Sequence, residues 1–117
     1  MVRAKMKDFI KKHLTKVEHA TKKQKEKELW DVSGILKNRL NQKLKYDLRP
    51  YDIDTMGRDV KPITTKSKAN KIVFEQVNKY VIVEAAELHN FIITHGLKEI
   101  NLDDIIDALE WTININK

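Results

Sequence analysis

The stretch on which the fold prediction depends is residues 64–113, TTKSKANKIVFEQVNKYVIVEAAELHNFIITHGLKEINLDDIIDALEWTI. Apolar side chains recur at helical intervals from Lys66 to Thr94, with no Gly or Pro between them, which predicts one long helix. The part from Lys79 to Glu84 is rich in β-branched residues and is strand-like in isolation. The whole segment is too long for a strand, however, and the Ala-Ala-Glu-Leu that follows favours a helix.

The predicted long helix ends at His95-Gly96, because glycine readily adopts the left-handed conformation of a helix C-terminus. A short loop over Leu97–Asn101 follows. Asp103 and Asp104 then begin a final short helix, at an end where the helix dipole favours acidic residues. Because the long helix is apolar on more than one side, it needs several neighbours. A small chain is not expected to supply them all, so we expect a partner chain.

The N-terminal half is predicted to hold two further helices. The first covers residues 4–20 and is amphipathic and basic, and the second covers residues 29–46, where Gly34 weakens the helical pattern. Residues 21–28 contain no apolar side chain. Either the helix continues there as an exposed stretch supported by neighbouring charge pairs, or the segment is a hinge. Residues 50–62 form a loop or one short helix.

Charge is distributed unevenly along the chain. Residues 1–49 contain 15 Lys and Arg against 6 Asp and Glu, a net charge of +9, whereas residues 91–117 have a net charge of −3. This asymmetry favours a polyanion as the partner of the N-terminal half and a protein as the partner of the C-terminal half. The alternative is a lysine-rich solvated surface with no partner.

Composition excludes several other classes of protein. The chain has no Cys, so disulfides and thiolate metal sites are excluded. Its longest apolar run, Val81–Val83, is too short to span a membrane, and Lys and Arg interrupt every apolar stretch near the N-terminus. The His residues are too dispersed for a metal pair. We therefore expect an intracellular protein, not secreted, that is not an enzyme and uses no cofactor, metal, membrane or small-molecule substrate.

From about residue 63 to residue 113 the chain resembles the histone fold of archaeal and eukaryotic core histones. The matching features, in chain order, are the loop Thr64-Thr65-Lys66, the helix start Lys68-Ala69, the second loop Gly96-Leu97-Lys98-Glu99-Ile100, and the pairs Asp104-Ile105 and Ala108-Leu109 of a third helix. The chain departs from the family at Leu97, where an Arg usually pairs with the Asp of the third helix. The first helix of the fold is either Tyr51–Arg58 or Leu29–Leu44.

The resemblance implies an all-α, histone-fold-like domain over residues 29–117, preceded by a basic N-terminal helical extension over residues 1–28. It also implies a handshake dimer, formed as a homodimer or with a histone-fold heterodimer partner, that binds the phosphate backbone of double-stranded DNA without sequence specificity. The predicted dimer interface is Val73, Val77, Tyr80, Val81, Ala85 and Leu88. The predicted DNA contacts are Lys66, Lys68 and Lys98 in the loops, and Lys5, Lys11, Lys12, Lys16, Lys22 and Lys23 in the extension.

The main alternative is a helical adaptor or regulatory subunit that binds another protein and makes no contact with nucleic acid. The acidic C-terminal segment and Glu99 favour this alternative, whereas the charge of the N-terminal half favours DNA. RNA in place of DNA stays open, although no aromatic RNA-binding platform is evident.

Overall fold

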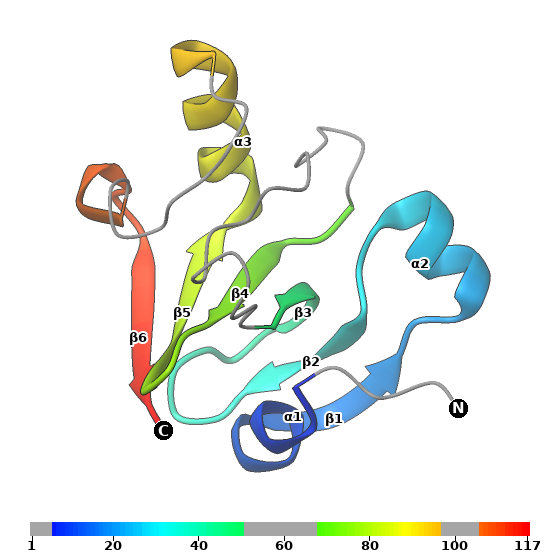
Figure 1. The fold of residues 1–117 in the computed structure, drawn as a ribbon. Coiled ribbons are helices and arrows are strands. Elements are labelled where there is room, and N and C mark those ends of the chain that lie inside the picture. The colour runs from blue at the N-terminus through cyan, green and yellow to red at the C-terminus, as the bar shows by residue number, and fades with distance from the viewer. Residues whose placement is uncertain (1–5, 51–67, 97–105) are drawn as a thin grey trace.

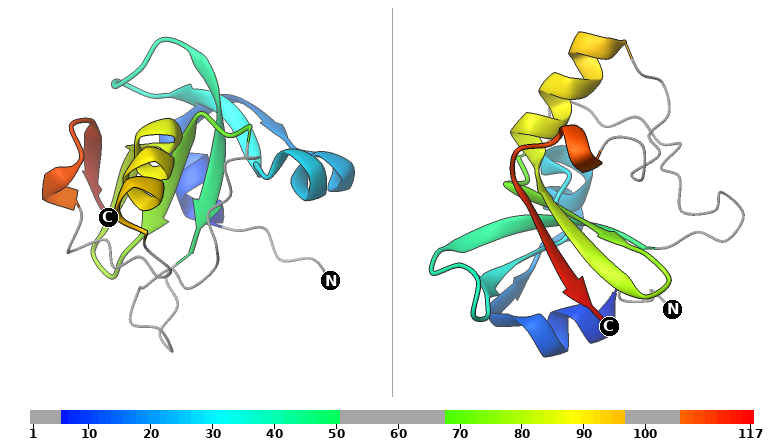
Figure 2. Two further views of the ribbon diagram at one scale, coloured as in Figure 1. Left: turned by 90° about the horizontal axis from the view of Figure 1, so that it is seen from above. Right: turned by 90° about the vertical axis from the view of Figure 1, so that its left-hand side faces the viewer.

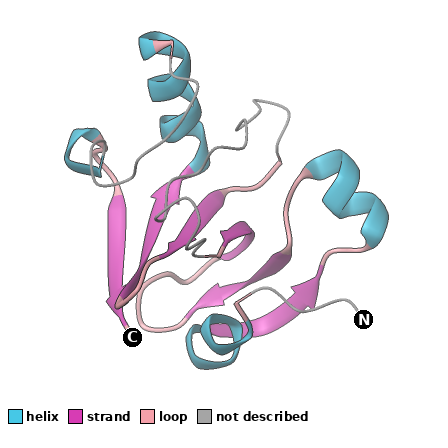
Figure 3. Ribbon diagram, in the orientation of Figure 1, coloured by secondary structure: helices cyan, strands magenta, loops and turns pink. Residues whose placement is uncertain are grey.

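A computed structural model describes residues 6–50, 68–96 and 106–117 of the chain. These residues form a six-stranded mixed sheet in which the strands follow one another in chain order (Figure 1, Figure 3). The strands are β1 (Leu14–His19), β2 (Val32–Leu36), β3 (Lys43–Arg49), β4 (Lys71–Glu75), β5 (Lys79–Glu84) and β6 (Thr112–Asn116). Neighbouring strands are antiparallel except β3 and β4, which run parallel.

Short helices lie on both faces of the sheet and at one end of it. They are α1 (Lys7–His13), α2 (Lys22–Glu28) and α3 (Ala85–His95), together with a 3₁₀ turn, η2 (Ile106–Ala108). One face of the sheet packs with α1 through Phe9, and the other packs with α3 through Leu88. The two views of Figure 2 show these helices on opposite sides of the strands. The core therefore has two layers, one on each face of the sheet.

The prediction of an all-α histone fold is wrong. The described part of the segment predicted as one long helix contains β4, β5 and α3. The chain reverses at residues 76–78, where the Gln76 N–H donates to the Lys79 carbonyl at 2.8 Å. Only the part from Ala85 onward is helical. The predicted final helix is wrong as well within residues 106–117, which contain a 3₁₀ turn followed by β6.

The error has a physical cause in the burial of the two central strands. Val81 and Ile82 are consecutive in β5 and point to opposite faces, yet both are fully buried, one in each core layer. A strand that is covered on both faces is apolar at nearly every position. Its sequence therefore resembles a helix that is apolar on two sides. We had expected a partner chain to cover part of this apolar segment. In the structure, other elements of the same chain cover it.

The helix predicted over residues 29–46 is also wrong, because β2 and β3 form an antiparallel hairpin there. Gly34 lies in β2, where a Cβ atom would be 3.0 Å from the carbonyl oxygen of Thr15 in β1. The glycine thus permits the close approach of two strands. The helix predicted over residues 4–20 is confirmed only for α1, since the chain becomes extended at Leu14 and pairs with β2.

Neither alternative for residues 21–28 holds as stated, because Lys22–Glu28 is helical but β1 separates this helix from α1. The prediction that a helix ends at His95-Gly96 is confirmed. α3 ends at Gly96 in the left-handed conformation, with φ of 61°. The loops predicted at residues 50–62 (apart from Pro50), 64–66 and 97–101, and the helix start at residues 103–104, lie outside the described residues.

Candidate nucleic-acid interface

Most of the exposed cations of the N-terminal half lie near the β1 edge of the sheet. α1, β1 and α2 follow one another along this edge, opposite β6 (Figure 1). We call this surface the basic edge and define it by nine exposed side chains: Lys11, Lys12, Lys16, Lys22, Lys23, Lys25, Lys27, Lys37 and Arg39. Five of them were among the predicted DNA contacts. Lys5, Lys66 and Lys98 lie outside the described residues.

The position of α1 is fixed by aromatic packing on the sheet. Phe9 is fully buried, with its ring centroid 4.9 Å from that of Tyr80 in β5. His13 contacts both rings, at centroid distances of 5.5 Å from Phe9 and 6.0 Å from Tyr80. These contacts hold the C-terminal end of α1 against the sheet. Lys12, one residue before His13, is therefore presented from a fixed helix end.

The turn between β2 and β3 brings two more cations to the same place. The Lys37 N–H donates to the His13 carbonyl at 2.8 Å. Asn38 adopts the left-handed conformation, with φ of 61°, and this conformation turns the chain toward Arg39. Burial lowers the pKa of His13, and the positive charges of Lys12, Lys37 and Arg39 lower it further. The three cations thus gather around one imidazole.

Sequence reasoning missed Lys37 and Arg39, because it placed both inside a predicted helix. A signal for the turn was present in Asn38, since asparagine tolerates the left-handed conformation. No local sequence pattern indicates that β2 pairs with β1. This pairing places Lys37 beside His13.

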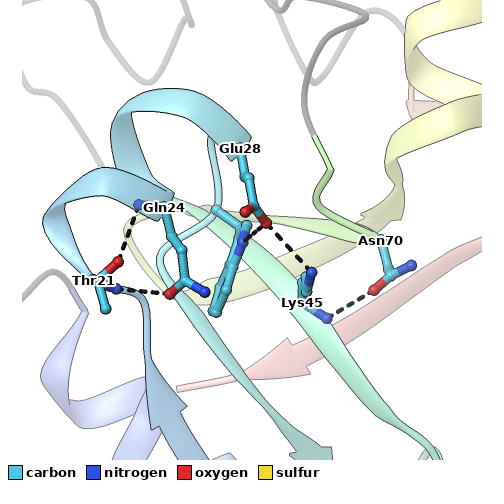
Figure 4. Close-up of polar contacts among 6 residues, drawn as sticks. Thr21, Gln24, Glu28, Lys45 and Asn70 are labelled. Atoms are coloured by element: carbon cyan, nitrogen blue, oxygen red, sulfur yellow. Dashed lines mark hydrogen bonds and ion pairs between the residues drawn. The ribbon is translucent and has the colours of Figure 1, made fainter.

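α2 is a short helix that buries none of its side chains. Its N-terminus is closed by a capping box, in which Thr21 Oγ1 accepts from the Gln24 N–H at 3.1 Å and Gln24 Oε1 accepts from the Thr21 N–H at 2.9 Å (Figure 4). Its first turn contains Lys22 and Lys23 and no acidic residue, an arrangement that the helix dipole disfavours. The two lysines therefore do not serve the stability of this helix.

The other end of α2 is anchored to the sheet through Glu28. Its Oε1 atom accepts a hydrogen bond from Trp30 Nε1 at 3.0 Å and contacts Lys45 Nζ at 3.5 Å (Figure 4). The hydrogen bond from Trp30 and the charge of Lys45 lower the pKa of Glu28, and Lys68 contributes to the same effect. Trp30 is itself buried against Ala20 and Ala69. The orientation of α2 thus depends on one carboxylate and one indole.

Lys68 is brought to this end of α2. Its backbone N–H donates to the Glu28 carbonyl at 2.7 Å. Asn70, two residues later, accepts from the Lys45 N–H through Oδ1 at 2.9 Å. Of the loop lysines predicted to contact DNA, Lys68 is the one that lies within the described residues. It stands next to the basic edge, although not for the reason that the histone resemblance gave.

Three acidic residues of β1, α2 and β3 form ion pairs with cations of β3. Three ion pairs form in this way: Glu18 with Lys43 at 2.6 Å, Glu28 with Lys45 at 3.5 Å, and Asp47 with Arg49 at 2.9 Å. The other two ion pairs between described residues involve Lys71 and Lys117. No cation of the basic edge is within ion-pair distance of a described acidic residue. The nine cations of this surface therefore form no direct ion pair with a described residue, and they outnumber the acidic residues of α1, β1 and α2, which are Asp8, Glu18, Glu26 and Glu28.

The residues predicted to form a dimer interface do not form a surface. Val73, Tyr80, Val81, Ala85 and Leu88 are all buried, and they are divided between the two core layers. Val77 is 72% exposed and lies at the reversal between β4 and β5. The handshake for which these residues were proposed requires a long central helix, which the structure replaces with strands.

Two buried polar atoms have no hydrogen-bond partner within the described residues, Tyr46 Oη and His89 Nε2. They lie on opposite faces of the sheet, since Tyr46 belongs to the α1 layer and His89 to α3. Burial raises the pKa of Tyr46 to about 12. Burial and the charge of Arg49 lower the pKa of His89. Because they are apart, they do not form a catalytic pair.

Within residues 6–50, 68–96 and 106–117, no group of three or more His, Asp or Glu side chains is placed to hold a metal ion. None of the helices described is both long enough and apolar enough to cross a membrane. Comparison with protein-family models, curated proteins and solved structures found no match for this chain.

Proposed function

We propose that this protein binds the phosphate backbone of double-stranded DNA, without sequence specificity, through the basic edge. The observation that carries the proposal is the separation of paired from unpaired cations. Lysines and arginines of β3 and β4 form ion pairs, whereas those of α1, β1, α2 and the β2–β3 turn do not pair with described acids. Like charges held close together repel and oppose folding. A polyanion relieves this repulsion.

The dimensions of the basic edge suit a duplex. The cluster around His13 and the lysines of α2 lie at opposite ends of β1. A strand of this length spans about 20 Å, which corresponds to about six base-pair steps along one DNA strand. Lys16 lies between the two ends. Such contacts would position the protein on the backbone and read no bases.

The first test is the binding of the purified protein to a short random-sequence duplex, followed by fluorescence anisotropy at several salt concentrations. We expect the logarithm of the binding constant to fall linearly with the logarithm of salt, by about 0.9 per phosphate contacted. The double variant Lys22→Gln, Lys23→Gln should reduce this slope by up to about 1.8. The mechanism predicts a change in slope and not only in affinity.

The control is Lys79→Gln with Lys117→Gln, which removes the same charge near the opposite edge of the sheet and, in addition, the ion pair of Lys117 with Glu75. We expect this control to change the slope by less than about 0.5. Equal effects of the two double variants would mean that only net charge matters, and would refute the basic edge as the site. Absence of binding at low salt would refute DNA binding and favour the alternative, a protein-binding adaptor.

The imidazole of His13 provides a local probe of the same proposal. Phosphate oxygens next to Lys12, Lys37 and Arg39 would stabilise the protonated imidazole. We therefore expect the pKa of His13, followed by NMR, to rise when duplex DNA is added.

A further inference from the structure

The two edges of the sheet differ in whether they can accept another strand. At the β1 edge the register shifts between Thr15 and Glu18, and Lys16 adopts a left-handed conformation with φ of 52°. Bulges and charged side chains are devices that prevent an edge strand from pairing. At the other edge, β6 pairs with β5 over five consecutive residues without a bulge, and its sequence Thr-Ile-Asn-Ile-Asn contains no charge and no proline.

The ladder between β5 and β6 determines which residues of β6 direct their backbone N–H and C=O groups toward β5 and which direct them outward. The Lys117 N–H donates to the Asn78 carbonyl at 3.0 Å. Because hydrogen-bonded and non-hydrogen-bonded pairs alternate in an antiparallel ladder, Ile115 and Ile113 also bond to β5. The backbone groups of Thr112, Asn114 and Asn116 then point away from the sheet. They meet no partner among the described residues.

We propose that the outer edge of β6 pairs in antiparallel register with β6 of a second copy of this chain, with the two-fold axis at Asn114. In this register Asn114 faces its counterpart, and Thr112 faces Asn116 of the second copy. All the outward backbone groups are then used, in about six hydrogen bonds. If the two-fold axis passed through any other residue of β6, some of these outward backbone groups would have no partner. The strand is therefore complementary to itself.

The side chains also suit this register. Ile113 of one copy stands opposite Ile115 of the other, on the face of the sheet that packs with α1. Ile113 and Trp111 are only half-buried in the single chain, so the second copy would cover them further. Asn114 is exposed and neutral, so no like charges meet at the axis. The two sheets would join into one continuous sheet.

The interface is small, and we therefore expect a weak, reversible dimer, with a dissociation constant of micromolar order. Analytical ultracentrifugation of the wild-type protein at increasing concentration measures it. Asn114→Lys places two ammonium groups opposite each other at the axis, and should weaken dimerisation at least about tenfold. Asn90→Lys, the same change at an exposed position of α3, should leave dimerisation unchanged.

A second variant tests the direction of the backbone. Asn114→Pro removes an outward N–H and leaves the bonds between β6 and β5 in place, so it should produce a monomer. Hydrogen exchange gives the same information without mutation. The exchange rate of the Asn114 N–H should decrease as the protein concentration rises, whereas the exchange rate of the Ile113 N–H should not change. A wild-type protein that remains monomeric at millimolar concentration would overturn the proposal, as would an Asn114→Lys variant that dimerises equally well.

Discussion

The assignment of β5 as a strand buried on both faces leads to a quantitative prediction for Ile82. This side chain is 0% exposed in the α1 layer of the core. Ile82→Ala removes three carbons, for which burial contributes about 0.8 kcal/mol each. The cavity that remains adds to this loss, so we expect the free energy of unfolding to fall by about 3–4 kcal/mol. That is a large fraction of the stability of a small domain.

Urea denaturation followed by circular dichroism measures this change. Val81→Ala removes two carbons from the opposite core layer, and we expect a loss of about 2–3 kcal/mol. Val77→Ala, at the exposed reversal between β4 and β5, should cost less than about 0.5 kcal/mol. Comparable losses at Val77 and Val81, or a loss below about 1 kcal/mol at Ile82, would refute the strand assignment.

Two further predictions concern Gly34 and His89. Gly34→Ala should destabilise the protein by about 1–2 kcal/mol in the same urea assay, because the new Cβ would press on the Thr15 carbonyl of a paired strand; an unchanged midpoint would show that β1 can move away. The lowered pKa of His89 means that the unfolded chain binds a proton near pH 6.5 while the folded chain does not, so stability should be full above that pH and decrease as the pH falls below it. His89→Leu should reduce this decrease, because it removes the titrating group; an unaltered pH profile of the unfolding midpoint would contradict the prediction.

The error in the fold prediction came from a particular ambiguity. β4 and β5 are apolar on both faces because α1 and α3 cover the sheet from opposite sides. A helix surrounded by neighbours has the same composition, and residues 71–94 contain no glycine or proline to mark the reversal at residues 76–78. The β-branched run of Lys79–Glu84 was a correct local signal. We did not follow this signal, because we treated Lys66–Thr94 as one continuous helix.

Signals that depend on single residues were more reliable. Gly96 ends α3 because a left-handed residue is needed there. Thr21 and Gln24, which satisfy each other's backbone N–H groups at the start of α2, were a second local signal, although we did not use it to predict that helix. Both effects act within a few residues of chain, and sequence inspection can therefore detect them.

Some features of the basic edge could be predicted from the sequence, and others depend on the tertiary structure. Sequence alone determined that Lys11, Lys12, Lys16, Lys22 and Lys23 belong to an excess of positive charge in the N-terminal half, because charge is a property of composition. That they bind DNA stays a prediction. Only the tertiary structure decided which cations are neutralised, and that Lys37 and Arg39 join Lys12 around His13. Strand pairing brings these residues together across a long separation in sequence, and no local pattern in the chain specifies that pairing.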